Sequence, residues 1–375
     1  MRLVHVSDCY PPRTGGIESH VSDLAARQAV TGDEVHVLTA TPSADGARHG
    51  VVEEVSGVQV HRMGTRLPFE LPVNPVEGPR LLRAALRTIR PDVVHVHAGM
   101  VSPFAFDGAR LAVAAGLPTV ITWHCMLDRV LPALRLGVRT TRWRTVPAAL
   151  TAVSDSAARR VEAVFGAPVE VLPNGLDMAT WAPAGPDPGR SSGPLHLVAT
   201  MRLVPRKRTL PLVRMVARAA ERLPPDRVRL TVIGSGPSEG RVRAAVTRLG
   251  MERQVTLAGR LDRPAVRERY RDADVFVAPA ASEAFGIAAL EARASGLIVL
   301  GRRGTGMAEF VTDGVDGWLV DDDAQMVDTI VRLARDPALT GRMLAHNRQV
   351  RPAFDWSDVL EAARAQYARA ARLVG

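Results

Sequence analysis

Residues 274–295 read DVFVAPAASEAFGIAALEARAS, which is one complete step from a buried strand to a helix. The apolar run 274–280 predicts a strand buried on both faces, and the residues after Gly286 predict a helix. Two carboxylates, Glu283 and Glu291, stand eight residues apart with no charged residue between them. A strand that leads directly into a helix is the repeating unit of a parallel sheet covered by helices, so this stretch predicts an α/β fold.

The same alternation of strand and helix runs along most of the chain. Segment 16–30 predicts an amphipathic helix, and segment 50–63 is typical of a hairpin. One face of that helix is formed by Ile17, Val21, Leu24, Ala25 and Gln28. Parallel strands are predicted at 2–8, 34–40, 92–98 and 119–125 in the first half, and at 195–203, 228–237, 255–261, 274–280 and 297–303 in the second. The chain therefore reads as two doubly wound units.

The domain boundaries follow from composition. A length of 375 residues suits two domains of ordinary size. The Pro-, Gly- and Ser-rich segment 182–194 predicts a linker between a first domain, 1–181, and a second domain, 195–355. The last segment, 356–375, predicts a long amphipathic helix that packs back on the first domain.

Composition also limits the class of protein. Hydrophobic residues make up 46% and charged residues 23%, which is typical of a soluble globular chain. No apolar run approaches the roughly 18 residues of a membrane-spanning helix, and the N-terminus begins directly with a strand pattern. We therefore expect a cytoplasmic protein. Cys9 and Cys125 are predicted to be reduced, and no metal-ligand spacing is found, so we expect neither a metal nor another cofactor.

The net charge of +9 favours anionic partners such as nucleotide phosphates or acidic lipid surfaces. Nucleic acid is a poor candidate, because no recognised binding module and no stacking aromatics accompany the basic segments. Lys207 is the only lysine in the chain, beside many arginines. Its retention suggests a task for a compact ammonium group, although survival at a solvated loop is the alternative.

Ligands of open parallel sheets bind outside the carboxyl ends of the strands, so residues there are candidates. In the first half, Gly15 and Gly16 precede a helix and either let its backbone approach an anion or form a tight turn. His124 ends strand 119–125, where it either meets a ligand or makes structural hydrogen bonds. His97 has the same two interpretations, of which the structural one is favoured.

In the second half, Arg202 and Lys207 follow a strand and suit a diphosphate, since arginine offers a fork of donors and lysine a point charge. Gly234 and Gly236 follow the next strand as a close-approach turn. Gly259, Arg260 and Leu261 occupy the equivalent place after the strand at 255–261.

The stretch around Glu283 and Glu291 can now be interpreted. A helix N-terminus carries unpaired N–H groups and a partial positive charge, which attract a phosphate. Here those donors belong to Phe285, Gly286, Ile287 and Ala288. The two carboxylates would bracket one ligand and accept hydrogen bonds from its hydroxyl groups. The alternative is an ordinary surface helix with two exposed glutamates.

Together these motifs resemble a family. EAFGIAALE (283–291) is similar to the E-x7-E element of retaining glycosyltransferases of family four, which have the GT-B architecture of two Rossmann-like domains that face a central cleft. The segments PPRTGGIESHV, VSDSAARRV, VEVLPNGLD, MRLVPRK, VIGSGP and VTLAGRL follow in the order typical of that family. The resemblance covers nearly the whole chain.

The resemblance implies a nucleotide-sugar donor held mainly by the second domain, with retention of anomeric configuration by front-face attack and no metal. Arg202 and Lys207 would bind the diphosphate, Glu291 the ribose and Glu283 the hydroxyls of the donor sugar. His124 would lie at the reacting sugar. Further donor contacts would come from Gly16, Gly234, Arg260, Leu261, Phe285, Gly286, Ile287 and Ala288.

The chain departs from the family pattern near its second glutamate-containing element, GTGMAEF (304–310). Thr305 replaces the first glycine of the usual pair and Ala308 replaces a proline, whereas Glu309 is kept. Ala280 stands where serine is usual. These changes bear on the geometry of the donor loop.

Donor and acceptor are suggested by similarity to mannosyltransferases that act on phosphatidylinositol mannosides, which implies GDP-mannose and a lipid or cell-envelope acceptor with a hydroxyl group. The basic segment 130–150 either touches an anionic membrane surface at its periphery or is a solvated helix. Alternatives are a UDP-sugar-dependent transferase acting on a small molecule or natural product, and a nucleotide-sugar epimerase. A non-catalytic nucleotide-binding protein is disfavoured, because the charged motif residues are intact.

Overall fold

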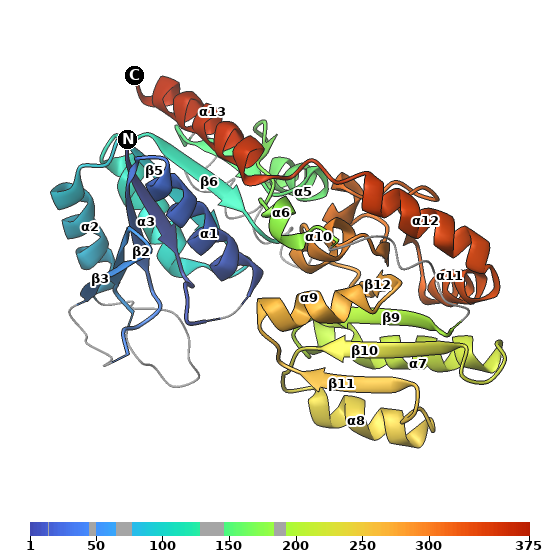
Figure 1. Cartoon of the computed structure of the whole chain (residues 1–375). Helices are drawn as coiled ribbons and strands as arrows, with labels where there is room; N and C mark the ends of the chain where they lie inside the picture. Colours follow the sequence, from blue (N-terminus) through green and yellow to red (C-terminus); the bar gives the residue numbers. More distant parts are fainter. Residues whose placement is uncertain (14, 45–49, 65–76, 128–145, 184–192) are drawn as a thin grey trace. The chain divides into compact units, whose positions relative to one another are not determined.

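The computed structural model describes two compact units, which are treated separately below (Figure 1). The first unit consists of Met1–Gly175 and Phe354–Gly375, and the second of Leu176–Ala353. The boundary thus falls six residues before the position predicted from sequence, and most of the predicted linker lies outside the described residues. The described residues are 1–13, 15–44, 50–64, 77–127, 146–183 and 193–375.

The first unit contains an eight-stranded sheet with the order β3-β4-β2-β1-β5-β6-β7-β8. All neighbouring strands are parallel except β3 and β4, which form the predicted hairpin. The strands are β1 (Arg2–Ser7), β2 (Glu34–Thr39), β3 (Val51–Val55), β4 (Val58–Arg62), β5 (Val93–Ala98), β6 (Thr119–Trp123), β7 (Ala149–Ala152) and β8 (Glu170–Val171).

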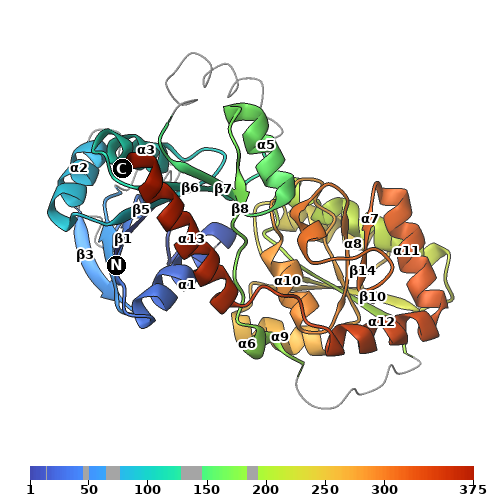
Figure 2. The same cartoon turned by 90° about the horizontal axis from the view of Figure 1, so that it is seen from above.

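Helices cover both faces of this sheet, as predicted. They are α1 (Gly16–Val30), α2 (Gly78–Ile89), α3 (Pro103–Ala114), α5 (Asp155–Phe165) and α13 (Trp356–Val374). The C-terminal helix α13 contacts β5, β6, β7 and α1, so it closes one face of the sheet together with α1 (Figure 2). On the opposite face, α3 packs so closely that a Cβ atom added at Gly108 would lie 2.6 Å from Cγ1 of Val6.

Side chains alternate between the two faces of a strand, and the two faces of this sheet differ in chemistry. Toward α13, a layer of apolar residues packs against the helix. It contains Leu3, Val93, Val120, Ala149 and Leu172 of the sheet side, with Ala363, Tyr367 and Ala370 of α13. Further along the strands, the same face carries buried polar residues instead: His5, His95 and Thr122 two residues on, and His97 four residues on. The strands therefore hold a polar layer inside the unit.

The second unit contains six parallel strands in the order β11-β10-β9-β12-β13-β14. They are β9 (Leu195–Thr200), β10 (Val228–Ile233), β11 (Val255–Gly259), β12 (Val275–Val277), β13 (Ile298–Arg302) and β14 (Gly317–Val320). The five strands predicted from sequence are present. The sequence analysis missed β14, and in the first unit β7 and β8, because these strands have only four, four and two residues.

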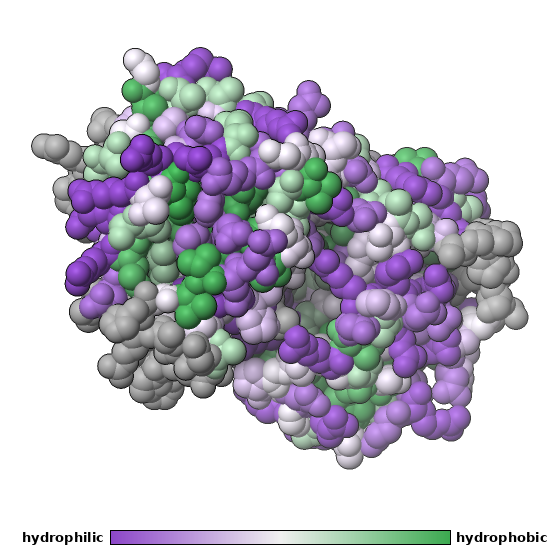
Figure 3. Space-filling view, turned by 60° about the vertical axis from the view of Figure 1, so that its left-hand side comes forward, coloured by the Kyte–Doolittle hydropathy of each residue, from purple (hydrophilic) through white to green (hydrophobic). Residues whose placement is uncertain are grey.

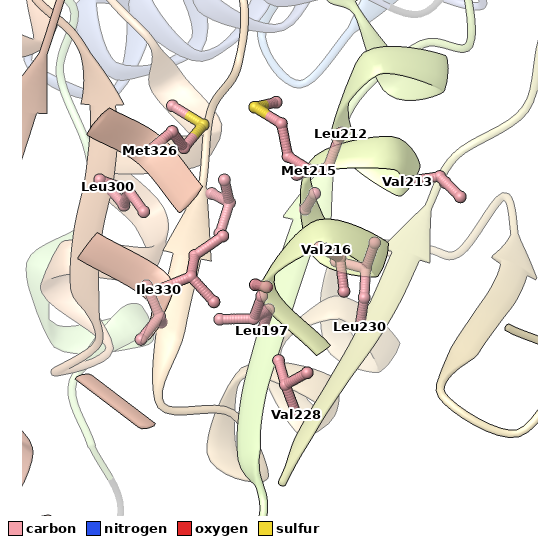
Figure 4. Close-up of a cluster of buried hydrophobic side chains, with 14 of the residues drawn as sticks. Leu197, Leu212, Val213, Met215, Val216, Val228, Leu230, Leu300, Met326 and Ile330 are labelled. Atoms are coloured by element: carbon pink, nitrogen blue, oxygen red, sulfur yellow. The ribbon is translucent and has the colours of Figure 1, made fainter. Parts of the chain in front are cut away.

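The core of the second unit lies between β9, β10 and β13 and the helices α7 and α11 (Figure 4). Its labelled side chains include Leu197, Leu230, Val216, Met326 and Ile330. The helical segments are α6 (Met178–Trp181), η3 (Pro205–Lys207), α7 (Thr209–Glu221), α8 (Glu239–Arg248), α9 (Arg263–Arg271), α10 (Ile287–Ala294), η4 (Gly306–Glu309), α11 (Asp323–Arg335) and α12 (Pro337–Gln349).

The surface is predominantly hydrophilic on the face drawn in Figure 3, where hydrophobic residues occur in small groups between polar ones. In the part of the chain that the structure describes, no helix combines the length and the apolar character that crossing a membrane requires.

Candidate active site

Each sheet has a switch point, which is a strand whose two neighbours in the sheet are joined to the chain on opposite sides of it. In the second unit, β9 lies between β10 and β12; in the first, β1 lies between β2 and β5. Such switch points open a crevice at the carboxyl ends of the strands, where ligands of open parallel sheets bind. The residues that follow β9 and β12 are therefore the first to consider.

Lys207 and Glu283 come together at this switch point. Lys207 ends the short helix η3 after β9, and Glu283 lies in the loop after β12. The Lys207 ammonium donates a hydrogen bond to Oε2 of Glu283, and both side chains remain 23% exposed. The sequence analysis assigned these residues separate ligand contacts. The ion pair places a positive and a negative group side by side, both within reach of solvent.

The segment that carries Lys207 is anchored by its neighbour, Arg208. This residue has a left-handed backbone with φ 61° and begins α7. Its guanidinium donates to both carboxylate oxygens of Asp323, at 2.8 and 2.7 Å. Arg302, at the end of β13, also binds Asp323. Sequence reasoning missed this cluster, since Arg208 and Asp323 lie 115 residues apart. Arg202 lies on the same loop and is exposed.

The helix predicted to begin near Gly286 is α10. Gly286 has a left-handed backbone with φ 94°, and a Cβ atom there would lie 3.1 Å from Cγ of Met307. Phe285 is buried against Phe310, with ring centroids 5.6 Å apart. Ile287 and Ala288 form the first turn and are half-buried. Glycine is therefore required where the backbone turns into the helix.

Glu291 is 9% exposed, which excludes the alternative of an exposed surface glutamate at this position. It lies on α10 near Tyr270. Burial raises the pKa of the Tyr270 hydroxyl well above its usual value, and the negative charge of Glu291 adds to that shift. The Tyr270 hydroxyl donates to Oγ1 of Thr200, at the end of β9, at 2.9 Å. A carboxylate held at low exposure beside the strand ends is suited to accept hydrogen bonds from hydroxyl groups.

The structure requires glycine at positions 234 and 236 whether or not a ligand binds there. Both have positive φ angles, 128° and 157°. A Cβ atom at Gly234 would lie 2.0 Å from the Met201 carbonyl oxygen, and one at Gly236 would lie 2.6 Å from that of Leu203. These glycines let the loop after β10 pack on the loop that carries Arg202. After β11, Arg260 is exposed and Leu261 half-buried.

The departures from the family pattern can be explained at two positions. Thr305 has an extended backbone with φ −103°, which any residue adopts, and its hydroxyl donates to the Arg302 carbonyl at 2.6 Å. Gly306 is the residue that must stay small, because a Cβ atom there would lie 2.0 Å from the Ala284 carbonyl oxygen. Its N–H donates to the Glu283 carbonyl at 2.9 Å. Ala308 is exposed, and Ala280 is buried.

In the first unit, α1 begins at Gly16, which is exposed. Gly15 precedes it in an extended conformation, with φ 178°, so backbone conformation does not demand a glycine there. A Cβ atom at Gly15 would meet the carboxylate of Glu18, whose Oε2 would lie 2.4 Å away. The side chain of Glu18, the acidic residue in the first turn of α1, therefore occupies the space beside this glycine.

His124 follows β6 and is half-buried. Its Nε2 lies 3.0 Å from Nδ1 of His97, and its ring centroid lies 5.4 Å from that of His20. Burial lowers the pKa of His124 to about 3, so its imidazole is neutral at physiological pH. His97 is buried and also contacts His5 at 2.9 Å, which confirms its structural interpretation. A neutral His124 offers one donor and one acceptor and no positive charge.

Comparison with known proteins agrees with this description. A family model described as Glycosyltransferase Family 4 matches residues 14–180, and one described as Glycosyl transferases group 1 matches residues 194–336. The D-inositol 3-phosphate glycosyltransferase of Kribbella flavida is 32% identical, over 98% of this chain and 94% of its own length.

Solved structures share the fold at low identity. Sucrose-phosphate synthase from Thermosynechococcus elongatus matches with a TM-score of 0.76 and 17% identity, over 98% of this chain and 99% of that one. Anabaena Alr3699/HepE in complex with UDP-glucose matches with a TM-score of 0.75 and 18% identity, over the same shares of the two chains. These structures show the GT-B fold of two Rossmann-like sheets, and the family models show that the chain is a glycosyltransferase. Within that class, the chain belongs to family 4, and it is a retaining hexosyltransferase that uses a nucleotide-sugar donor.

Proposed function

We propose that this enzyme moves a hexose from a nucleoside diphosphate sugar to a hydroxyl group of an inositol phosphate or a closely related polyol phosphate. The donor side is supported by one observation above all: Lys207 and Glu283 are paired at the switch point of the second sheet. The acceptor side is supported by the several relatives named D-inositol 3-phosphate glycosyltransferase.

The charged residues receive distinct tasks in this proposal. Arg202 and Lys207 bind the diphosphate, the first as a fork of donors and the second as a point charge. Glu283 holds the ammonium of Lys207 at the strand ends and accepts hydrogen bonds from hydroxyls of the donor sugar. Glu291 accepts hydrogen bonds from the ribose. Its low exposure supports this task, because a desolvated carboxylate makes stronger hydrogen bonds than a solvated one.

The remaining donor contacts are proposed from the resemblance to the family. The first turn of α10 would direct its backbone N–H groups at the phosphates, with the positive end of the helix dipole behind them. The packing of Gly234 on the neighbouring loop supports an indirect contribution, in which it shapes the loop of Arg202. These donor-binding residues are Gly16, Gly234, Arg260, Leu261, Phe285, Gly286, Ile287 and Ala288.

The reaction breaks the bond between the anomeric carbon and the diphosphate oxygen, and the electron pair leaves with the diphosphate. The acceptor oxygen bonds to the same face of the anomeric carbon, so configuration is retained. Its proton passes to an oxygen of the leaving diphosphate. Arg202, Lys207 and the α10 N-terminus stabilise the negative charge that develops, and the proposal assigns no step to a metal ion. His124, neutral because it is buried, contributes a hydrogen bond to the reacting sugar.

Two finer expectations remain proposals. GDP-mannose is the donor implied by the sequence resemblance, whereas a structural relative was solved with UDP-glucose, which supports a uridine nucleotide. Contact with an anionic membrane was predicted for the basic segment 130–150, most of which lies outside the described residues. Both expectations can be examined in the same assay.

The test incubates the protein with UDP-glucose, UDP-GlcNAc, ADP-glucose or GDP-mannose. Each donor is paired with inositol 3-phosphate, inositol, or vesicles that contain phosphatidylinositol, and release of nucleoside diphosphate is measured. We expect release that requires inositol 3-phosphate and an α-linked product by NMR. Turnover only with vesicles would replace the acceptor by a lipid. Donor conversion without any acceptor would favour an epimerase and contradict the proposal.

A further inference from the structure

The buried polar layer of the first unit forms one continuous line of hydrogen bonds. It starts at His124 and passes through His97 and His5 to Gln28 of α1, with successive contacts of 3.0, 2.9 and 2.7 Å. Gln28 then reaches Tyr367 of the C-terminal helix at 2.8 Å. A residue at the candidate active site is thus connected, through the core, to a helix near the end of the chain.

From Tyr367 the line returns into the sheet. The Tyr367 hydroxyl lies 3.0 Å from Nδ1 of His95, and Nε2 of His95 lies 2.7 Å from Oγ1 of Thr122. Thr122 contacts Oγ1 of Thr151 at 2.7 Å. Thr151 donates to the backbone carbonyl of Ile121 at 3.3 Å. The last member is a carbonyl oxygen, which can only accept.

That terminal acceptor gives the line a direction. If Thr151 donates to Ile121, then Thr122 donates to Thr151, His95 to Thr122, and Tyr367 to His95. Gln28 donates its amide N–H to Tyr367, so its carbonyl oxygen accepts from Nε2 of His5. His5 then accepts at Nδ1 from His97, and His97 accepts at Nδ1 from His124. Every group donates to the next one, and each neutral histidine has one tautomer.

The opposite direction is possible only with one hydrogen bond fewer. If the Gln28 amide were rotated so that its nitrogen and oxygen changed places, donor and acceptor would be exchanged in every hydrogen bond between Thr122 and His124. The single proton of Thr151 would then be needed by Thr122, and the hydrogen bond from Thr151 to the Ile121 carbonyl would be lost. The forward direction makes one more buried hydrogen bond and is therefore favoured.

A metal site is the competing interpretation. One ring nitrogen from each of His5, His95 and His97 lies within 4.8 Å of the other two, which suits a small ion. However, all their ring nitrogens already have hydrogen-bond partners, namely His97 and Gln28 for His5, Tyr367 and Thr122 for His95, and His5 and His124 for His97. Binding an ion would break several of these bonds. The cluster therefore fits a hydrogen-bond relay better than a metal site.

We propose that Gln28 and Tyr367 are positioning residues that, through His5 and His97, hold the proton of His124 on Nε2 and keep Nδ1 as a hydrogen-bond acceptor. Among the described residues, no hydrogen bond reaches Nδ1 of His124. This nitrogen is the one that accepts a hydrogen bond from a hydroxyl of the reacting sugar. Only that last step rests on the proposed function; the position of the proton does not.

The C-terminal helix α13 contributes Tyr367 to the relay. Tyr367 is buried and holds the Gln28 amide by accepting its N–H. Without that hydroxyl, the amide is free to turn around. A reversed amide would donate to His5, and the proton of His124 would move from Nε2 to Nδ1. The active-site histidine would then present a donor in place of an acceptor.

The experiment measures the tautomer of His124 in the full chain by long-range ¹H–¹⁵N correlation spectra of ¹⁵N-histidine-labelled protein at neutral pH. The His124 signals are assigned by their loss in His124→Ala. We expect a protonated Nε2 and a bare Nδ1 in the wild type. Tyr367→Phe keeps the packing ring but removes the hydroxyl, and should give a mixture of both tautomers. Its kcat/KM should fall about tenfold, the effect of one lost hydrogen bond.

Tyr10→Phe is the matched control, because it removes another buried hydroxyl of the same unit that is not in the relay. It should leave the His124 signals unchanged. Gln28→Met provides a second disruption if Tyr367→Phe does not fold. A wild-type proton on Nδ1, or unchanged His124 signals in a folded relay variant, would overturn the proposal. So would stoichiometric zinc in the purified protein that His5→Ala abolishes.

Failure of the proposed function leaves a different pattern. If His124→Ala turned over normally, the contact with the sugar would be wrong, although the tautomer measurement would stand because it needs no substrate. If His124→Ala lost activity while Tyr367→Phe kept both its activity and the wild-type tautomer, the relay would be wrong and the role of His124 would remain.

Discussion

The two units have the same kind of sheet but opposite chemistry at their strand ends. In the first unit, the polar layer on β1, β5 and β6 is made of neutral residues: histidines, threonines, a glutamine and a tyrosine, joined by hydrogen bonds in the interior. In the second unit they are ionic, with Lys207 on Glu283, and Arg208 and Arg302 on Asp323. Those ionic side chains retain more exposure than the buried histidines, apart from Arg302, which is 8% exposed.

The difference shows how burial determines which polar groups a fold can hold. A charge transferred into the interior loses its hydration, whereas a neutral group loses only hydrogen bonds that the protein can replace. The first unit therefore keeps its histidines uncharged. The second unit keeps Lys207 and Glu283 near solvent, where the lysine remains able to meet an anionic diphosphate. Acid and the loss of Lys207 test this contrast directly, and two smaller changes in the loop after β13 test how closely the second unit is packed there.

The largest effect is expected from acid. Burial lowers the pKa of His5 to about 4 and that of His124 to about 3, and it lowers the pKa values of His20, His95 and His97 well below the usual 6.5. Below pH 6.5 these histidines bind protons in the unfolded chain but remain neutral in the folded unit. The free energy of unfolding should therefore fall by about 1.4 kcal/mol per pH unit for each such histidine.

Asp8 acts in the opposite direction. Burial raises the pKa of its carboxyl to about 6, against the hydrogen bonds it accepts from Phe104 and Ala105, so it stabilises the folded state as pH falls from 6 to 3.8. One carboxyl cannot offset five histidines. Hydrogen exchange between pH 7 and 4.5, corrected for the intrinsic rate, should show β1 and β5 losing protection before β9 and β10. Equal loss in both units would refute the contrast.

Second, Lys207→Ala should reduce turnover about 100- to 1000-fold, as expected when a group that stabilises developing charge is removed. Arg206→Ala is the control, since it removes a neighbouring charge of the same short helix and Arg206 is exposed. It should change turnover less than about threefold. Release of nucleoside diphosphate measures both, and thermal unfolding checks the fold. Near-normal turnover of Lys207→Ala would remove the ionic site from the proposal.

Third, Gly306→Ala should destabilise the second unit by about 1–3 kcal/mol, because the new methyl group would overlap the Ala284 carbonyl. The matched change is Gly304→Ala, two residues earlier, where a Cβ atom meets nothing within 4 Å. There only the left-handed φ of 74° opposes the change, at about 1 kcal/mol. Urea unfolding of both variants gives the comparison. A larger loss in Gly304→Ala would contradict the close approach.

The smallest effect is expected for Thr305→Gly, which restores the glycine usual in the family. Thr305 is buried and has an extended backbone, and its hydroxyl binds the Arg302 carbonyl. Glycine would lose that bond and gain freedom in the unfolded chain, so stability should fall by about 0.5–1.5 kcal/mol. Donor affinity should change less than about threefold, as measured by calorimetry. A large gain in affinity would mean that the threonine distorts the donor loop.

Much of the fold could be predicted from the sequence, because it depends on local patterns. Buried parallel strands are continuous apolar runs, and the helix faces follow a 3.6-residue period. The strands β7, β8 and β14 escaped prediction, since two to four residues hold too little pattern. The start of α10 near Gly286 was predictable because the apolar strand pattern ends before it and a helical pattern follows.

The candidate site was predictable only residue by residue. Sequence position indicated Lys207, Glu283 and His124 as strand-end residues, and Glu291 as a residue of the helix that follows, because parallel strands present their carboxyl ends at one edge. Sequence position did not indicate which side chains these residues would contact. His95 and His97 are spaced by two along β5, which could have indicated one shared face, but nothing indicated that Gln28 of α1 would be the acceptor for His5 of β1.

What the sequence determined by itself is therefore the architecture and the residue types at its edges, since hydrophobic periodicity and turn chemistry act between near neighbours. Only the tertiary structure decided which of those residues meet. Lys207 and Glu283 are 76 residues apart, and Gln28 and Tyr367 are 339 apart. Hydrogen bonds and ion pairs act over about 3 Å. Partners so distant in the chain come within that range only when the packing of sheets and helices brings their elements together.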